Sequence, residues 1–372
     1  MASGRLLRAV EPLPLRPAPG ISPLGALREA VTEHLADGPC HVSFSGGRDS
    51  SAVLAAAVDC ARREGLPDPV PISARFPDAP RSEESSWQER VISHLSLEDW
   101  IRVDVGSGEL DVVGPRARSI LERHGLISPA NMVFVSVTIE AAAGGRLLTG
   151  LGGDDVFAEW RWREIADAVV GRRRINRFDV LDGAYLRAPR RVRRALDRRF
   201  LNPPPPPWLR PEASARARAL TAEERLDEPA SWPAWLRWCA GRVHLRAVAA
   251  AFDALAADAG TRVAHPLLDA GFLAALGEAG GATGFGDRSR LMTAVFSEVL
   301  PGDVCSRPDK AKFDEVYWTD HAREFVAGWY GGGLDPELVD VEALRAELDE
   351  PVPDPRGWML VQSGWLARAR AA

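Results

Sequence analysis

The apolar and polar positions of the chain follow two patterns in turn up to about residue 160. Short apolar runs that stop at glycine or proline are typical of buried strands, and stretches with apolar residues three or four positions apart are typical of helices. Helical stretches separate the strand-like runs, which predicts the α/β fold class with a doubly wound parallel sheet. The expected strands are His41–Phe44, Val70–Phe76, Trp100–Val105 and Arg146–Gly150.

The helical patterns lie before, between and after these strands. Trp232, Trp235 and Trp238 recur at helical spacing, which favours the core of a largely helical C-terminal region over a substrate cage. The earlier helical stretches are Pro23–Leu35, Ser50–Ala61, a stretch up to Leu95 that Ser82-Glu83-Glu84 is expected to cap, and Met132–Ala143.

The turn after the first strand reads Ser45-Gly46-Gly47-Arg48-Asp49-Ser50. A strand, a glycine turn and a helix N-terminus form an anion site, because glycines let backbone N–H groups approach phosphate oxygens and the helix dipole favours negative charge. No lysine follows the glycines, so this is not the phosphate loop of Walker-type proteins. The alternative is a plain turn that lets the strand and helix pack closely, and the six positions together favour the phosphate loop.

The turn after the fourth strand reads Thr149-Gly150-Leu151-Gly152-Gly153-Asp154-Asp155. Two adjacent carboxylates suit Mg²⁺, which takes one or two carboxylates and fills its other positions with water and phosphate. Taken alone, such a turn is equally typical of a solvated loop. In a doubly wound sheet, however, ligands bind at the carboxyl ends of the strands, so both glycine-rich turns can face one ligand.

Composition narrows the class of protein. A net charge of −6 argues against a nucleic-acid or membrane protein, and no stretch has the ~18 apolar residues that a membrane span needs. The N-terminal segment lacks the apolar core of a signal peptide. The seven histidines show no metal-ligand spacing. The four cysteines have no C-x-x-C spacing, which indicates reduced structural thiols and a cytoplasmic location; they are Cys40, Cys60, Cys239 and Cys305.

Lysine is almost absent from the chain. The 46 basic residues include only two lysines, Lys310 and Lys312. Lysine is a compact point charge on a flexible stem, able to follow a phosphate that moves, so a catalytic lysine would resist replacement by arginine. Lys310 is therefore the candidate catalytic residue, and chance is the alternative explanation for the pair.

An arginine-rich segment extends from Arg161 to Arg210, with 14 arginines against five acidic residues and a local net charge of +9. Pro203–Pro207 add a stiff, extended stretch. One interpretation is a solvated helical hairpin with a proline spacer. The other is a docking surface for an acidic substrate peptide, a carrier or a leader-binding partner; RNA is not favoured, because no aromatic-rich loop accompanies the charge.

These segments together resemble the synthetase domain of asparagine synthetase and its relatives, β-lactam synthetase and the lasso-peptide cyclases. Four motifs carry the resemblance: S-G-G-x-D-S at Ser45–Ser50, [ST]-G-x-G-x-D-[DE]-x-F at Thr149–Phe157, P-x-L-D at Pro266–Asp269 and K-x-x-F at Lys310–Phe313. The first is shared with several ATP pyrophosphatases, which split ATP between the α and β phosphates. The second and the fourth, in this order, narrow the resemblance to this family.

The resemblance implies ATP and Mg²⁺ as cofactors and a role for each matched residue. Lys310 matches the lysine that stabilises charge during adenylation and amide formation. The other implied residues are Ser45, Gly46, Gly47, Asp49 and Ser50 for the pyrophosphate portion of ATP, Ser43, Ser73, Thr149 and Gly150 for the adenosine pocket, and Asp49 and Asp154 for magnesium.

Three departures limit what is carried over from the family. The phosphate loop begins at Ser45, so the N-terminal glutaminase domain of asparagine synthetases is expected to be absent. Leu151 stands where asparagine synthetase has glutamate and β-lactam synthetase has tyrosine, and leucine cannot deprotonate an attacking amine. Ala264 replaces the arginine that usually precedes the third motif.

The sequence thus predicts an AMP-forming, Mg-ATP-dependent ligase that makes an amide bond, as in peptide macrolactam formation during natural-product biosynthesis. The alternatives are an amidotransferase that uses free ammonia or a separate glutaminase subunit, and an inactive nucleotide-binding regulatory partner. The expected organisation is an N-terminal arm and helix (1–38), an ATP-pyrophosphatase core (39–160), an Arg/Pro-rich insertion (161–215) and a helical region with the lysine loop (216–372).

Overall fold

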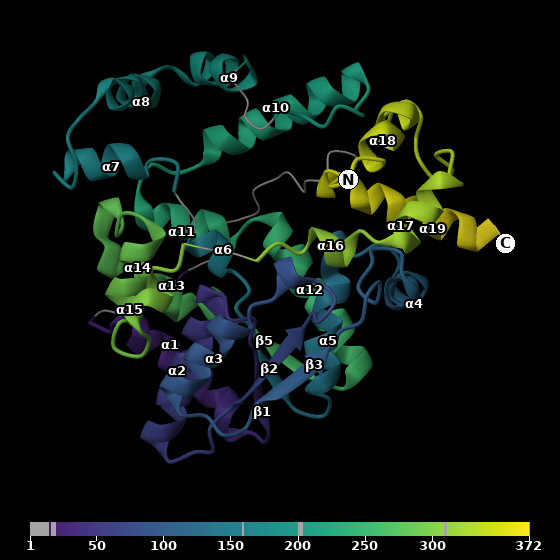
Figure 1. Ribbon diagram of the computed structural model, residues 1–372. Coiled ribbons are helices and arrows are strands. Elements are labelled where there is room, and N and C mark those ends of the chain that lie inside the picture. The colour runs from purple at the N-terminus through teal and green to yellow at the C-terminus, as the bar shows by residue number, and fades with distance from the viewer. Residues whose placement is uncertain (1–14, 16–19, 158–159, 200–203, 309–310, 372) are drawn as a thin grey trace.

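A computed structural model of the protein contains one five-stranded sheet with the strand order β3-β2-β1-β4-β5 (Figure 1). It describes residues 15, 20–157, 160–199, 204–308 and 311–371. All strand pairs are parallel, and the order reverses between β1 and β4, which is the topological switch point of a doubly wound sheet. The predicted fold class is confirmed. The strands are β1 (Cys40–Ser43), β2 (Val70–Arg75), β3 (Ile101–Asp104), β4 (Arg146–Leu148) and β5 (Arg262–Ala264).

Helices cover both faces of this sheet (Figure 1). Successive strand residues point to opposite faces, so Leu148 packs into the cluster that contains α1 and α2 while Leu147 packs against α12. The helices of this α/β part are α1 (Pro23–Ala36), α2 (Arg48–Glu64), α3 (Ser85–Leu95), α4 (Pro115–His124), α5 (Val133–Ala141), α6 (Gly153–Val156), α12 (Val243–Ala259) and α13 (Ala270–Gly280).

A layer of helices lies above the sheet in Figure 1, on the side of α6. It contains α7 (Arg163–Val169), α8 (Arg177–Arg187), α9 (Arg190–Arg199) and α10 (Pro211–Asp227). Below it, α11 (Trp232–Ala240) buries Trp232 and Trp235 in the core, as predicted, while Trp238 is partly buried and packs against the same cluster. Next to α11 and α13 are α14 (Arg288–Phe296) and α15 (Gly302–Cys305).

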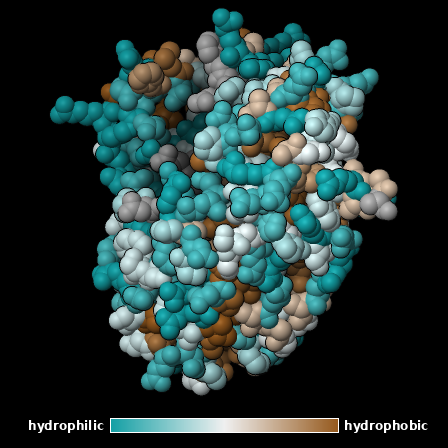
Figure 2. Space-filling view, turned by 45° about the vertical axis from the view of Figure 1, so that its right-hand side comes forward, coloured by the Kyte–Doolittle hydropathy of each residue, from teal (hydrophilic) through white to brown (hydrophobic). Residues whose placement is uncertain are grey.

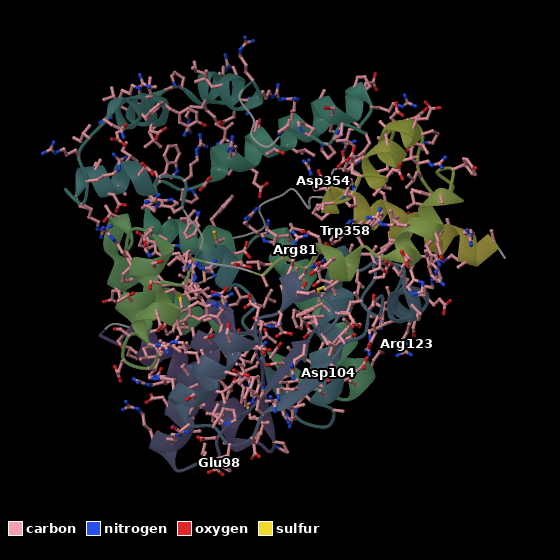
Figure 3. All side chains as sticks on the ribbon, in the orientation of Figure 1. Arg81, Glu98, Asp104, Arg123, Asp354 and Trp358 are labelled. Carbon is pink, nitrogen blue, oxygen red and sulfur yellow. The ribbon has the colours of Figure 1, made fainter. Side chains whose placement is uncertain are left out.

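The C-terminal helices build a second core beside β2 and β3. Trp358, labelled in Figure 3, stacks on Trp318 with ring centroids 6.4 Å apart, and both belong to a cluster that also contains Phe76 of the loop after β2. These helices are α16 (Asp314–Tyr317), α17 (Asp320–Ala327), α18 (Val341–Leu348) and α19 (Trp358–Ala371). Short 3₁₀ turns complete the description: η1 (Pro80–Ser82), η2 (Ala130–Met132), η3 (Pro266–Leu268), η4 (Gly281–Thr283) and η5 (Pro355–Gly357).

Three sequence expectations need correction. The sheet has a fifth strand that was not expected, because Arg262–Ala264, within the region expected to be largely helical, pairs with β4. The boundary expected at residue 215 falls inside α10, which is one continuous helix. Within Ser82-Glu83-Glu84 the contact with the start of α3 comes from Glu83, whose carboxylate accepts from the Ser85 N–H at 3.0 Å; the N-cap residue Glu84 makes no side-chain cap, because its carboxylate is bound elsewhere.

Two further findings concern the cysteines and the helices. All four cysteines are buried and free, and burial raises the pKa of Cys40 to about 12. Among the described residues, every helix is too short or too polar to cross a bilayer.

Candidate active site

The loop after β1 closes on itself through its two serines. Ser45 and Ser50 lie 3.1 Å apart between their hydroxyl oxygens, and Ser50 Oγ also accepts from the Ser45 N–H at 3.2 Å. Gly46 has φ +81°, a left-handed conformation that favours glycine, and Gly47 is the N-cap of α2. Together they form a compact loop whose N–H groups and helix N-terminus suit phosphate oxygens.

The loop after β4 packs directly against it, as expected at the switch point. A Cβ atom at Gly153 would lie 2.2 Å from Asp49 Cγ, and one at Gly150 would lie 3.0 Å from the Ser50 nitrogen. Only glycine leaves room for this contact. The structure thus brings both predicted turns together at one point.

Asp49 and Asp154 both bind the guanidinium of Arg288. Its Nη2 donates to Asp49 Oδ1 at 2.5 Å and to Oδ2 at 2.7 Å, and its Nη1 donates to Asp154 Oδ1 at 3.0 Å. Burial lowers the pKa of Arg288, but the two carboxylates outweigh that effect and the net pKa is raised. Two carboxylates that share one cation in this way also fit a divalent ion with phosphate as its remaining ligands.

Asp155 points away from this pair. Its Oδ1 lies 2.7 Å from His244 Nε2 of α12 and 3.6 Å from Arg242 Nη1. The second carboxylate of the Asp154-Asp155 pair therefore attaches the loop to α12, and Asp154 is the one that faces Asp49.

A cleft with a charged end and an apolar end opens at these loops. The charged end, about 630 Å³, is lined by Ser45, Asp49, Asp154 and Arg288. The apolar end, about 310 Å³, contains Phe76, Phe134 and Phe313, whose rings contact one another with centroids 5.6 to 6.1 Å apart. Because Ser45, Glu84 and Phe313 line both ends, the two are continuous. The three rings nearly fill the apolar end, so a flat group could enter it only if they move apart.

The four residues expected at the adenosine pocket have different positions. Ser43 lines the apolar end and donates to Thr138 Oγ1 at 3.2 Å. Ser73 is fully buried and its hydroxyl donates to the Phe44 carbonyl at 2.5 Å, so the neighbouring residues of β2 line the pocket in its place. Thr149 is buried, with Oγ1 at 2.7 Å from His265 Nδ1, and burial lowers the pKa of His265 to about 4. Gly150 lies in the contact between the loops.

A buried ion pair that could not be predicted from the sequence connects the phosphate loop (Ser45–Ser50) to the loop that contains both lysines (Ser306–Phe313). Arg307 and Glu84 have side chains only 4% and 8% exposed, and they form two hydrogen bonds of 2.6 and 2.7 Å. Arg307 Nη1 also donates to the Gly46 carbonyl at 2.9 Å, and the Ala311 N–H donates to Glu84 at 2.9 Å.

The candidate catalytic residue Lys310 lies outside the described residues, between Arg307 and Ala311. Its downstream neighbour Lys312 is held through its backbone: its carbonyl accepts from Ser82 Oγ at 2.7 Å and its N–H donates to the carbonyl of Arg81, which is labelled in Figure 3, at 3.2 Å. Both flanks of Lys310 are thus attached to the segment before α3.

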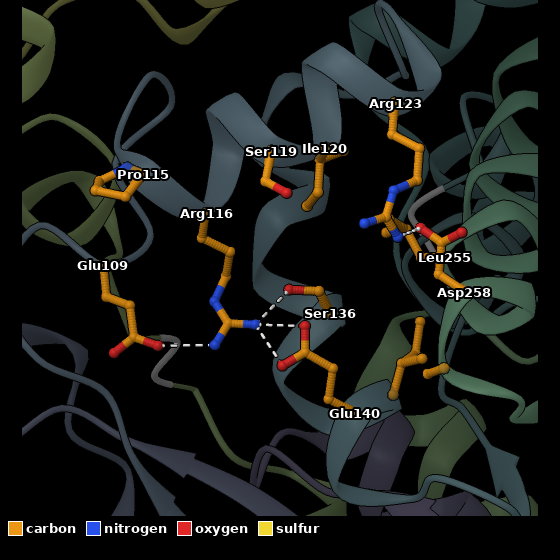
Figure 4. A pocket seen from close by; sticks show the side chains of 12 residues that line it. Glu109, Pro115, Arg116, Ser119, Ile120, Arg123, Ser136, Glu140, Leu255 and Asp258 are labelled. Carbon is orange, nitrogen blue, oxygen red and sulfur yellow. Dashed lines mark hydrogen bonds and ion pairs between the residues drawn. The ribbon is translucent and has the colours of Figure 1, made fainter.

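A larger cavity, about 1040 Å³, lies between α4, α5 and α12 and contains none of the motif residues (Figure 4). Its charges are already matched: Arg116 bonds to Glu109 at 2.9 Å and to Glu140 at 2.6 Å, and Arg123 bonds to Asp258 at 2.8 Å. This cavity offers no unpaired cation to a phosphate.

Comparison with known proteins identifies the family of the chain. Residues 24–366 match the sequence family described as asparagine synthase. Among curated proteins, none matches the chain. The matched range includes both glycine loops, the Glu84–Arg307 pair and Lys310.

Proposed function

Because the chain belongs to the asparagine synthase family, whose domain is that of an ATP-dependent carbon–nitrogen ligase, we propose that it activates a carboxylate as an acyl-adenylate. An amine of the same peptide would then displace AMP and close a macrolactam. The observation that carries this proposal is the convergence of Asp49 and Asp154, from two loops that touch at the switch point, beside a cleft with an apolar end.

The chain's own residues suit the first step. The glycine loop offers N–H groups to the phosphates, and the base would enter the apolar end of the cleft once its phenylalanine rings move apart. Asp49 and Asp154 would hold magnesium, which supplies electrostatic stabilisation of the phosphate charge when it is bound. The carboxylate oxygen attacks the α-phosphorus, the bond to the β-phosphate breaks, and pyrophosphate leaves. Positioning and electrostatics are the enzyme's main contributions.

Leu151 favours an amine that the substrate itself supplies. Its side chain packs at the edge of the core cluster that contains α12, and it carries no group that can accept a proton. An amine tethered to the carboxylate in one peptide gains effective concentration from the tether, which lowers the need for a dedicated base at this position. We therefore favour intramolecular closure over attack by free ammonia.

A surface on α7, α8 and α9, residues 169–199, supports a peptide substrate. Five of its apolar side chains are strongly exposed, and apolar groups stand among hydrophilic ones along the upper part of the molecule in Figure 2. Isolated apolar residues on a surface need no explanation, but five strongly exposed ones within 13 positions of the chain offer apolar contacts to a peptide. The residues are Val169 at 73%, Ile175 at 68%, Phe178 at 59%, Val180 at 65% and Leu181 at 63% exposure.

The charge of this 169–199 surface is only partly matched within the protein. Arg190 and Arg194 bind Glu223 of α10, and Arg173 binds Asp179, which fits the simpler interpretation of a paired helical surface. Other arginines have no acidic partner among the described residues, and they leave positive charge for an acidic peptide. They are Arg174, Arg177, Arg187, Arg191 and Arg198.

Reversing two of these unpaired charges should weaken capture of the peptide. In the double variant Arg191→Glu/Arg198→Glu, KM for a full-length acidic peptide substrate should rise on the order of tenfold at low salt, with kcat unchanged. The effect should fade as salt screens it. The control is Arg246→Glu/Arg370→Glu, which makes the same charge change at exposed positions of α12 and α19. Equal KM values for the two double variants would show that the 169–199 surface does not bind the peptide.

The nucleotide products test the proposed reaction. With a peptide that carries a carboxylate and an amine, the purified protein should release AMP and pyrophosphate in equal amounts, and the peptide should lose one water. Chromatography of the nucleotides and mass spectrometry of the peptide measure both. Sustained release of ADP and phosphate would contradict the adenylation step.

A further inference from the structure

Arg288 takes part in the site in a way that no sequence motif indicates. It is the first residue of α14, where the N-cap Asp287 accepts from the Arg290 N–H at 2.9 Å. From there its guanidinium reaches across to the two carboxylates that the proposed function assigns to magnesium. The geometry points to an exchange: Arg288 neutralises Asp49 and Asp154 in the empty enzyme, and it transfers to the phosphates when Mg-ATP binds. This inference rests on the proposed function.

The first reason is that the guanidinium and a metal ion would need the same oxygens. Both oxygens of Asp49 accept from Arg288 Nη2, at 2.5 and 2.7 Å, and Asp154 Oδ1 accepts from Nη1 at 3.0 Å. A divalent cation at this point would also meet a positive charge within contact distance, and like charges at that range repel strongly. The arginine therefore has to leave when the metal enters.

The second reason is that the guanidinium has a place to go. The side chains of Arg288 and Asp49 are 20% and 16% exposed, but that of Asp154 is 60% exposed, so the pair is open on the Asp154 side. Arg288 lines the same cleft as Ser45, Gly47 and Ser50 of the phosphate loop. A short side-chain rotation would keep it in the part of the cleft where the phosphates are expected.

The third reason is that Arg288 retains unused donor capacity. Its Nε is buried and has no hydrogen-bond partner among the described residues. A guanidinium has five N–H donors in a planar fork that matches phosphate geometry. Arg48, which donates to Ser289 Oγ at 3.3 Å, adds a second cation nearby, and burial and Arg288 together lower the pKa of Arg48. Two neighbouring guanidiniums favour a polyanion between them.

The exchange has a consequence for the order of binding. A metal ion alone must displace Arg288 without offering it a new partner, so it should bind weakly. ATP supplies phosphate oxygens for the displaced guanidinium, so metal and nucleotide should bind cooperatively. Arg288 would then be a phosphate-binding residue that also weakens the affinity of the carboxylate pair for a metal ion in the absence of nucleotide.

Binding measurements on Arg288→Gln test this, and they need no peptide substrate. Two probes are used by titration calorimetry: Mn²⁺ alone, and α,β-methylene-ATP with saturating Mg²⁺. Compared with the unchanged protein, Mn²⁺ alone should bind at least about tenfold more tightly and the nucleotide about tenfold more weakly, which is the size of one charge-assisted hydrogen bond. Arg290→Gln, whose side chain is 56% exposed and pairs with Asp287, is the matched control and should change neither affinity.

The exchange predicts that the affinity for Mn²⁺ rises while the affinity for the nucleotide falls, and the test depends on these opposite signs. If Mn²⁺ binds no more tightly, or if the nucleotide affinity does not fall, the exchange is wrong. Where Arg288→Gln does not fold, Arg288→Lys replaces it and should shift both affinities in the same directions by smaller amounts. If the unchanged protein binds no nucleotide at all, the proposed function fails, which is distinguishable from failure of the exchange.

Discussion

Lys310→Arg and Lys310→Ala should each lose at least ~100-fold in kcat, which is the size of the loss when one donor of an oxyanion hole is removed. The sequence resemblance implies that Lys310 meets phosphate and acyl oxygens whose negative charge grows as the adenylate forms. Arginine keeps the charge but is longer, planar and forked, so it should not restore the geometry. Steady-state kinetics with a fixed peptide substrate measure the loss.

Lys312→Arg is the matched control for this prediction. Its exposed side chain stands in the same loop, and the contacts that hold it involve its backbone, which the substitution leaves in place. It should lose little activity. Full activity in Lys310→Arg would show that a positive charge alone suffices. An equal loss of kcat in Lys312→Arg would contradict the assignment of Lys310 as the catalytic lysine.

Glu84→Gln should have the second largest effect, on both stability and rate. It leaves Arg307, only 4% exposed, as a buried charge with its carboxylate partner gone, and breaking a buried ion pair on one side costs about 3 to 5 kcal/mol. It also weakens the attachment of Ala311, next to Lys310, so kcat should fall about 100-fold, as a displacement of about 1 Å does. Thermal unfolding and kinetics below the transition measure the two effects separately.

Two further variants separate positioning by Glu84 from simple loss of folding. Glu83→Gln changes an exposed neighbour whose carboxylate accepts from the Ser85 N–H; glutamine keeps an acceptor oxygen there, so stability and rate should change little. Glu84→Met/Arg307→Leu removes both charges, so it should recover much of the stability while kcat stays low. Recovery of kcat together with stability would show that the pair serves the fold alone.

The sheet and the two glycine loops could be predicted because their signals are local. The apolar runs around Val42 and Leu148 and the glycines that follow them specify strand, turn and helix within about ten residues each, and parallel connection then places both turns at one edge. β5 was not predicted because it has only three residues at the sheet edge, with Arg262 exposed, which is too short for a recognisable pattern of apolar and polar residues. Its pairing with β4 decides its conformation.

The residues that complete the site could not be found in the same way. Glu84 and Arg307 are 223 positions apart, and Arg288 is 239 positions from Asp49, so only the folded chain shows that they are partners. Glu84 next to a helix start resembled a cap, although burial makes its carboxylate the partner of a buried arginine instead. A hint was available in the Arg288-Ser289-Arg290 run directly after an N-cap aspartate, since arginine in the first turn of a helix is unfavourable with the helix dipole and suggests another role.

The most direct test of the central claim follows one atom. A peptide substrate whose reacting carboxylate carries a heavy oxygen isotope is incubated with the protein, Mg²⁺ and ATP, and the products are analysed by mass spectrometry. If the carboxylate attacks the α-phosphorus, one labelled oxygen should appear in AMP for each amide bond formed, and pyrophosphate should carry none. Label in inorganic phosphate, with ADP as the nucleotide product, would show an acyl-phosphate route and contradict the account.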